Sequence, residues 1–238
     1  MSFFGLFKKT SKTKESAKSE PTEPELTFDD IIQDAHFEEV LSAEDFTFLK
    51  NIVQQWLDDE KLSQSLFAYC GFAFENAKEL QADFENLTEN TKPNYRLVPL
   101  GRDGSGGMYA VADNHKIAYI DEYVSNGFIA DNIKDFFSII VNCQFIGWYT
   151  GTSFLKNEET FIERIRQTEN DCGDIKESDT IQKFIKTNQL ESSLPAIYKK
   201  LRHVATTKSK SVLESTLEGD YEFETLLPIE ERIKSNEK

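Results

Sequence analysis

The sequence predicts an α+β fold, with a largely antiparallel sheet, flanking helices and a C-terminal helical extension. Helical periodicity runs up to about residue 90, short β-rich runs follow Pro93, and amphipathic stretches return after residue 150. The chain has 238 residues, 39% of them hydrophobic, which is enough to bury a sizeable core. We expect three parts, namely a disordered tail, an α+β domain and a helical extension packed on it, at residues 1–24, 25–149 and 150–238.

The N-terminal tail is rich in Lys, Ser, Thr, Glu and Pro, a composition that cannot bury enough surface to fold. As an alternative, its apolar start at residues 3–7 and the lysines that follow form a weak interfacial membrane anchor. The apolar patch is too short for a signal peptide and precedes the lysines, which is the wrong order. Since no run of about twenty apolar residues occurs, we expect no stable membrane insertion.

Two helices are predicted before residue 90. Ser42 caps the first, and its apolar residues recur at helical spacing and form one buried stripe. The second covers residues 72–87, while the stretch between them, with Gly71 as a break, is ambiguous. The apolar positions of the two stripes are Phe46, Leu49, Ile52, Val53, Trp56 and Leu57, then Phe74, Ala77, Leu80, Phe84 and Leu87.

Four short runs, "YRLVPL", "MYAVAD", "KIAYID" and "GFIA", have the β-branched and aromatic composition of strands. A tight turn at residues 112–115 joins the second to the third, so we expect an antiparallel meander. A helix follows, capped by Asp131 or Asn132. Its inward positions are Ile133, Phe136, Phe137 and Ile140.

Beyond Cys143, "QFIGWYTGTSF" fits either a strand or a turn. Three amphipathic stretches then predict the helices of the extension: "EETFIERIRQTE", "SDTIQKFIKTNQ" and "LPAIYKKLRHVATT". The charged C-terminal end is expected to fray.

The formal net charge is −15, and five lysines against three glutamates in residues 1–24 leave −17 on residues 25–238. Nucleic acid is therefore excluded as an expected partner, because phosphate backbones are bound by clustered Lys and Arg. A basic protein suits this charge, since complementary potentials steer association. Alternatively, the charge serves solubility alone.

The three cysteines, at positions 70, 143 and 172, are far apart and odd in number. No CxxC pair is present, and the three histidines do not stand at zinc-ligand spacing with them. We therefore expect no metal site, no cofactor and no disulfide framework. The absence of a disulfide framework favours a reducing compartment, hence the cytoplasm.

The stretch "LVPLGRDGSGGMYAV" invites a catalytic or phosphate-binding interpretation, which its residues do not support. Gly101 and Gly106 have P-loop spacing, but Gly and Met stand where Lys and Ser or Thr are required. A nucleophile elbow around Ser105 needs Gly where Asp103 stands, and both it and a Rossmann loop need a following helix where a strand is expected. We expect a non-enzyme.

The same residues fit a tight turn between two strands. Gly104, Gly106 and Gly107 allow positive backbone angles, while Arg102 and Asp103 brace the turn by a charge pair or by a carboxylate-to-amide bond. A paired-carboxylate site at residues 121 and 122 is not expected, because adjacent strand residues point to opposite faces.

The order "RLVPLGRDGSGGMYAVAD", "KIAYID", "GFIADNIKDFFSIIV" over residues 95–142 resembles the core of the SUKH superfamily (Smi/Knr-like domains). The shared features are a Pro-containing strand, an Asp/Gly-rich turn, a V-x-Y-I-D-like strand and an IA-x-x-F-x-x-F-type helix. The family's N-terminal Leu-Pro and Asn-Gly pairs have no clear counterpart here, and Ile133 replaces an aromatic residue. These departures indicate a divergent subfamily or an altered, divergent N-terminal half.

The resemblance implies an α+β bacterial immunity protein that binds a cognate polymorphic toxin, such as a nuclease, in the cytoplasm and blocks it without chemistry of its own. A basic toxin matches the acidic body. A scaffold or regulatory module acting on an endogenous partner is the alternative, and an enzyme ranks third. The candidate partner contacts, each with an ordinary solvated charge as its alternative, are Arg102, Asp103, Asp113, Asp121 and Glu122.

Overall fold

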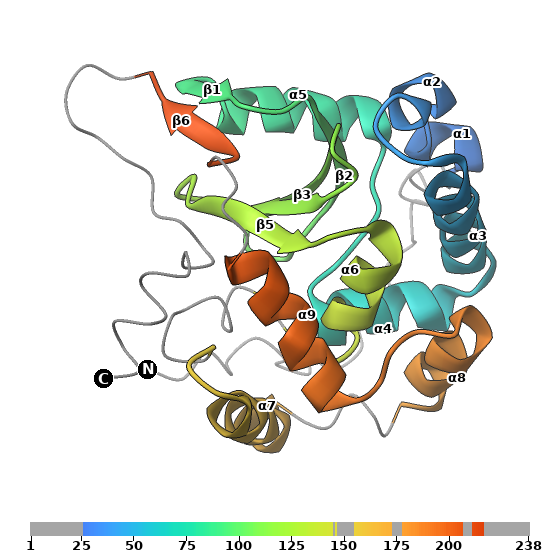
Figure 1. Cartoon of the computed structure of the whole chain (residues 1–238). Helices are drawn as coiled ribbons and strands as arrows, with labels where there is room; N and C mark the ends of the chain where they lie inside the picture. Colours follow the sequence, from blue (N-terminus) through green and yellow to red (C-terminus); the bar gives the residue numbers. More distant parts are fainter. Residues whose placement is uncertain (1–25, 145, 147–154, 173–177, 207–210, 217–238) are drawn as a thin grey trace, which may run out of the picture.

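The computed structural model describes residues 26–144, 146, 155–172, 178–206 and 211–216. It confirms the α+β class with a four-stranded antiparallel sheet flanked by helices (Figure 1). The predicted tail, most of "QFIGWYTGTSF" and the C-terminal end lie outside the described residues. The helices are α1 Phe28–Ile31, α2 Asp34–Glu38, α3 Ala43–Asp58, α4 Glu60–Cys70, α5 Ala77–Leu87, α6 Ile133–Ile140, α7 Glu158–Cys172, α8 Asp179–Asn188 and α9 Leu194–Thr206. The strands are β1 Thr91–Pro93, β2 Leu97–Arg102, β3 Met108–Ala112, β4 Ile117–Ile120, β5 Asn126–Ala130 and β6 Leu213–Ser215.

The long helices begin at the polar residues that the sequence offers as caps. Ser42 accepts a hydrogen bond from the Asp45 amide at the start of α3, and Asn132, rather than Asp131, caps α6. The ambiguous stretch is α4, and it ends where Gly71 takes a left-handed conformation, with φ of 61°. The second predicted helix was placed too early, because Asn76 caps α5 and residues 72–75 precede the helix.

The sheet is the predicted meander, in the order β2-β3-β4-β5. Every residue of β3, β4 and β5 is buried, so both faces of these strands are covered and none of them has a solvent-facing row. An aromatic cluster fills the space between the sheet and α6: Phe72, Phe74, Tyr109, Phe136 and Phe137, with neighbouring ring centroids 4.8–6.3 Å apart.

The described part of the C-terminal extension packs on the rest of the chain. Helix α9 contacts β5 and α6, and α8 contacts α4. Strand β6 pairs with β1, and the buried Asn126 side chain of β5 binds the backbone of Leu213, so β6 lies between β1 and β5 (Figure 1). One continuous core therefore contains residues from Ile31 to Leu213.

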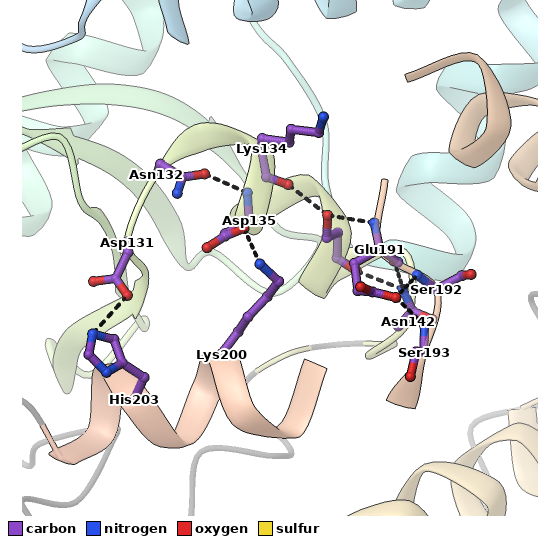
Figure 2. A network of polar contacts seen from close by, with 11 residues as sticks. Asp131, Asn132, Lys134, Asp135, Asn142, Glu191, Ser192, Ser193, Lys200 and His203 are labelled. Carbon is purple, nitrogen blue, oxygen red and sulfur yellow. Dashed lines mark hydrogen bonds and ion pairs between the residues drawn. The ribbon is translucent and has the colours of Figure 1, made fainter. Parts of the chain in front are cut away.

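Polar side chains fasten α6 to α9 and to the segment before α9 (Figure 2). Asn142 Nδ2 donates to the carbonyls of Ser138 and Glu191 at 2.8 and 2.9 Å, and the Glu191 amide donates to Ser138 Oγ at 3.1 Å. Lys200 Nζ pairs with Asp135 at 2.6 Å. These contacts fix the extension against the helix that closes the sheet. Within the described residues, no helix is long and apolar enough to cross a membrane.

Candidate functional site

Two turns meet at one end of the sheet. In a meander, alternate connections share an end, so the β2–β3 turn (residues 103–107) and the β4–β5 turn (residues 121–125) lie together. Of the five predicted contacts, Asp103, Asp121 and Glu122 belong to these turns. Asp113 lies in the β3–β4 turn at the opposite end, so the fold does not bring it to the other acids.

Asp103 organises the β2–β3 turn. Its Oδ1 accepts hydrogen bonds from the Ser105 amide at 2.8 Å, the Ser105 hydroxyl at 2.9 Å and the Gly107 amide at 2.8 Å. Its Oδ2 accepts from the hydroxyl of Tyr119 on β4. The predicted carboxylate-to-amide bond is confirmed, and one carboxylate holds the whole turn in a single shape.

Arg102 does not form the alternative charge pair with Asp103. Its guanidinium pairs with Glu75 and Asp83, each at 2.5 Å, so that part of the prediction is wrong. Neighbouring residues at a strand end point in opposite directions, which turns Arg102 toward α5 and Asp103 toward β4. Burial raises the pKa of the Glu75 carboxyl, and Arg102 opposes that rise. Arg102 therefore fastens β2 to the helix layer rather than orienting the turn.

The three glycines of the β2–β3 turn are required for different physical reasons, or not required at all. Gly106 has the expected positive φ, 101°, whereas Gly104 and Gly107 do not, which corrects the prediction of three positive angles. Gly107 is needed for space, because a Cβ there would stand 2.5 Å from the Tyr119 hydroxyl and 2.8 Å from the Asp103 carboxylate. A Cβ at Gly104 would meet only the Phe67 ring, at an ordinary 3.5 Å.

The β4–β5 turn holds a strained residue. Asp121 Oδ1 accepts hydrogen bonds from the amides of Tyr123 and Ser125 at 2.9 and 2.8 Å. Val124 has φ of 65°, a left-handed conformation that is a genuine outlier for a β-branched residue. Its side chain packs against the core, while the preceding Tyr123 is 75% exposed. A residue in a strained conformation thus directly follows an exposed aromatic residue in this turn.

The two turns and α4 form a continuous surface. The Phe67 ring, 51% exposed, lies beside Gly104, and Glu122 Cβ lies 3.7 Å from where a Cβ of Gly106 would stand. Tyr123 follows Glu122, and the hydrogen bond to the Glu122 carboxylate raises the pKa of the Tyr123 phenol. We call Phe67, residues 103–106, Glu122 and Tyr123 the turn surface. Among the described residues, the exposed large hydrophobic side chains are Phe67, Tyr69 and Tyr123.

The fold does not bring the imidazoles of His115 or His203 to the Ser105 hydroxyl of the turn surface. The Ser105 hydroxyl donates to Asp103, whereas His115 lies at the opposite end of the sheet, with Nδ1 2.8 Å from the Val40 carbonyl. His203 lies on α9, 3.5 Å from Asp131. In the part of the chain that the structure describes, no group of three His, Cys, Asp or Glu side chains is placed to hold a metal ion.

Negative charge is concentrated on the portion that carries the turn surface. Residues 26–144 contain 21 Asp and Glu against eight Lys and Arg. The described residues from 155 to 216 contain eight of each sign. Among the described residues, the excess of acidic side chains therefore belongs to the sheet, α6 and the helices before the sheet.

Sequence reasoning missed Phe67, Tyr123 and Val124. A signal for Phe67 exists, because Leu62, Leu66 and Cys70 form the inward stripe of α4 and leave Phe67 outside it. Tyr123 and Val124 carry no such signal, since they sit between two strands and their conformations depend on the turn.

Comparisons with protein-family models, with curated proteins and with solved structures each return no match for this chain.

Proposed function

We propose that this chain is a non-enzymatic immunity protein of the SUKH type, which binds and neutralises a cognate bacterial polymorphic toxin, such as a nuclease, in the cytoplasm. The residues of the resemblance form one contiguous unit, β2 to β5 followed by α6. The observation that carries the proposal is the turn surface, on which Phe67 and Tyr123 stand exposed on an acidic body.

Exposed aromatic rings on rigid supports are typical of protein-binding sites. Aromatic residues are enriched among the few side chains that dominate binding energy, and a preformed turn loses little entropy on association. The carboxylates of Asp103 and Asp121 hold the two turns through their amides, and Glu122 adds a charge at the rim. A toxin that grips phosphate groups has a basic active site, to which such a surface is complementary.

Co-expression tests the proposal. The probe is the variable C-terminal domain of a large secreted protein encoded beside the gene of this chain, produced in cells with and without the full chain. We expect survival only when the chain is present. Equal killing in both cultures contradicts the immunity proposal, and the absence of any such neighbouring gene favours a scaffold or regulatory module.

Substitutions on the turn surface test whether protection of the cells depends on that surface. The pair Phe67→Ala and Tyr123→Ala is expected to weaken binding at least about 30-fold, the cost of losing a dominant contact residue. Tyr69→Ala is the matched control, because Tyr69 is also exposed on α4 but points roughly 200° around the helix from Phe67. If the control loses protection as much as the double variant does, the turn surface is not the toxin-binding site.

A further inference from the structure

A cavity of about 340 Å³ lies where the end of α3 and the start of α4 meet α8. Helix α8 contacts α4 directly (Figure 1). The volume falls within the range of sites that hold small molecules. The residues that line this cavity, none of which belongs to the turn surface, are Gln55, Asp58, Asp59, Leu62, Thr180, Lys183, Phe184 and Thr187.

The lining carries both signs of charge and an apolar part. Asp58 and Asp59 stand at the junction of α3 and α4, whereas Lys183 belongs to α8. The lining residues of α8 recur at i, i+3, i+4 and i+7, which places them on one face of that helix. Leu62 and Phe184 are 4% and 2% exposed and supply the apolar part. One wall therefore brings carboxylates, and the α8 wall brings an ammonium group and two hydroxyls.

The opposite charges of the two walls do not pair with each other. Within the described residues, Lys183 forms no ion pair. The Asp58 carboxylate accepts a hydrogen bond from the Gln54 side chain at 2.9 Å, and the Asp59 carboxylate accepts one from the Leu62 amide at 3.1 Å. Neither aspartate has a cationic partner in that part of the chain. A cavity lined by unpaired charges of both signs is complementary to a ligand that also carries both signs.

A reciprocal amide pair fixes the two walls relative to each other. Gln55 Nε2 donates to Asn188 Oδ1, and Asn188 Nδ2 donates to Gln55 Oε1, each at 2.9 Å. This pair joins α3 to the C-terminal end of α8. The Phe184 ring also packs against Phe137 of α6, with the ring centroids 6.2 Å apart. Walls that are held in this way need little rearrangement when a ligand binds, which favours affinity.

We infer that this cavity binds a free amino acid with an apolar side chain. The ammonium group of the ligand pairs with Asp58 and Asp59, and its carboxylate pairs with Lys183. The side chain of the ligand covers Leu62 and Phe184. A purely cationic ligand would meet the like charge of Lys183, and a purely anionic ligand would meet the two aspartates, so a zwitterion satisfies both walls. This inference goes beyond the proposed function and does not depend on it.

Titration of amino acids into the ¹⁵N-labelled full chain at low salt tests the inference, with L-leucine and L-phenylalanine as probes. We expect saturable shifts of the amides of residues 58–62 and 180–187, with a dissociation constant of about 1 mM or tighter. The thermal unfolding midpoint should rise as ligand is added. Leucinamide lacks the carboxylate, N-acetylleucine lacks the positive charge and glycine lacks the side chain, so each should bind at least about tenfold more weakly than leucine.

Substitutions test whether binding takes place in this cavity. Asp58→Asn and Lys183→Gln each remove one charge from an exposed side chain of the lining. Each is expected to raise the dissociation constant of leucine at least about threefold, the cost of one charge pair at the surface. The matched controls Glu60→Gln and Lys186→Gln remove the same charges from exposed neighbours outside the lining and should leave the dissociation constant unchanged.

Four results overturn the inference: no saturable shift with either amino acid, shifts centred outside the lining, an analogue that binds as tightly as leucine, or control variants that weaken binding as much as the lining variants. The analogues are compared on the unaltered chain, so this outcome does not depend on the folding of a variant. A chain that binds leucine but protects no cell contradicts the immunity proposal alone. A chain that protects cells but binds no amino acid contradicts this inference alone.

Discussion

Asn126 is the side chain that joins the sheet to the last described strand. It is 2% exposed, its Oδ1 accepts the Leu213 amide at 3.0 Å, and its Nδ2 donates to the carbonyls of Val124 at 3.0 Å and Leu213 at 3.4 Å. Replacing Asn126 with alanine removes both partners of the Leu213 backbone from a site where Leu213 is 1% exposed. The Leu213 amide that is left behind then has lost its side-chain partner at a buried position.

The size of the effect follows from those contacts. A buried donor without a partner costs about 1–3 kcal/mol, and the lost bonds of Nδ2 add about 1 kcal/mol. We therefore expect Asn126→Ala to lower the free energy of unfolding by about 2–4 kcal/mol. For a chain of this size, that corresponds to a fall of the unfolding midpoint by about 5–15 °C.

Urea unfolding and amide hydrogen exchange of the full chain measure this change. Asn94→Ala is the matched control, because Asn94 Nδ2 also binds this segment, through the Ser211 carbonyl and the Glu214 carboxylate at 2.8 Å each, but at an exposed position. Its cost should stay below about 1 kcal/mol, since surface substitutions are usually small. Equal costs for the two variants, or an unchanged exchange rate of the Leu213 amide, would refute the argument from burial.

Other substitutions test the two turns. Gly107→Ala should lower the free energy of unfolding by about 1–3 kcal/mol, because its Cβ would overlap the Tyr119 hydroxyl, and a neutral result in urea titration contradicts that geometry. Val124→Gly should change stability by less than about 1 kcal/mol, since relief of about 1–2 kcal/mol of left-handed strain offsets the lost packing; a loss above about 2 kcal/mol shows that Val124 is not strained. Burial raises the pKa of Tyr109 and of Tyr119 above the ordinary value of 10, so above pH 10 the unfolded chain releases protons that the folded chain keeps. The contribution of these two pKa shifts to the free energy of unfolding is therefore fully present below pH 10. Above pH 10 it falls by about 1.4 kcal/mol per pH unit for each phenol. Tyr119→Phe should remove the contribution of one phenol to that slope.

Local signals explain why most of the fold was predictable. Ser42 and Asn132 cap α3 and α6 because a short polar side chain reaches amides within three residues. Gly71 ends α4 because glycine adopts a left-handed conformation easily, which is likewise a property of that residue alone. The meander followed from strand runs separated by short turns, and each of its pairings joins neighbours in the sequence.

Distant partners explain what was missed. Strand β6 has three residues, too few to show a period, and the residues with which it pairs in β1 lie 120 or more positions earlier. A charge pair of Arg102 with its neighbour Asp103 is one of two ways in which the sequence allows the turn to be braced, whereas the partners of Arg102 come from the segment around α5. The turn surface depends on Phe67 meeting Gly104 across α4 and the sheet, a contact that neither local sequence encodes.

The pairing of Thr91 with Ser215 has a consequence for how the protein is made. At about 5–20 residues per second, roughly 6–25 s separate the synthesis of β1 from that of β6. During this interval the meander can form, but the edge of β1 and the Asn126 side-chain amide have no partner until β6 has been synthesised. A message cut short before residue 213 therefore yields a chain with a bare strand edge, and such edges promote aggregation and degradation.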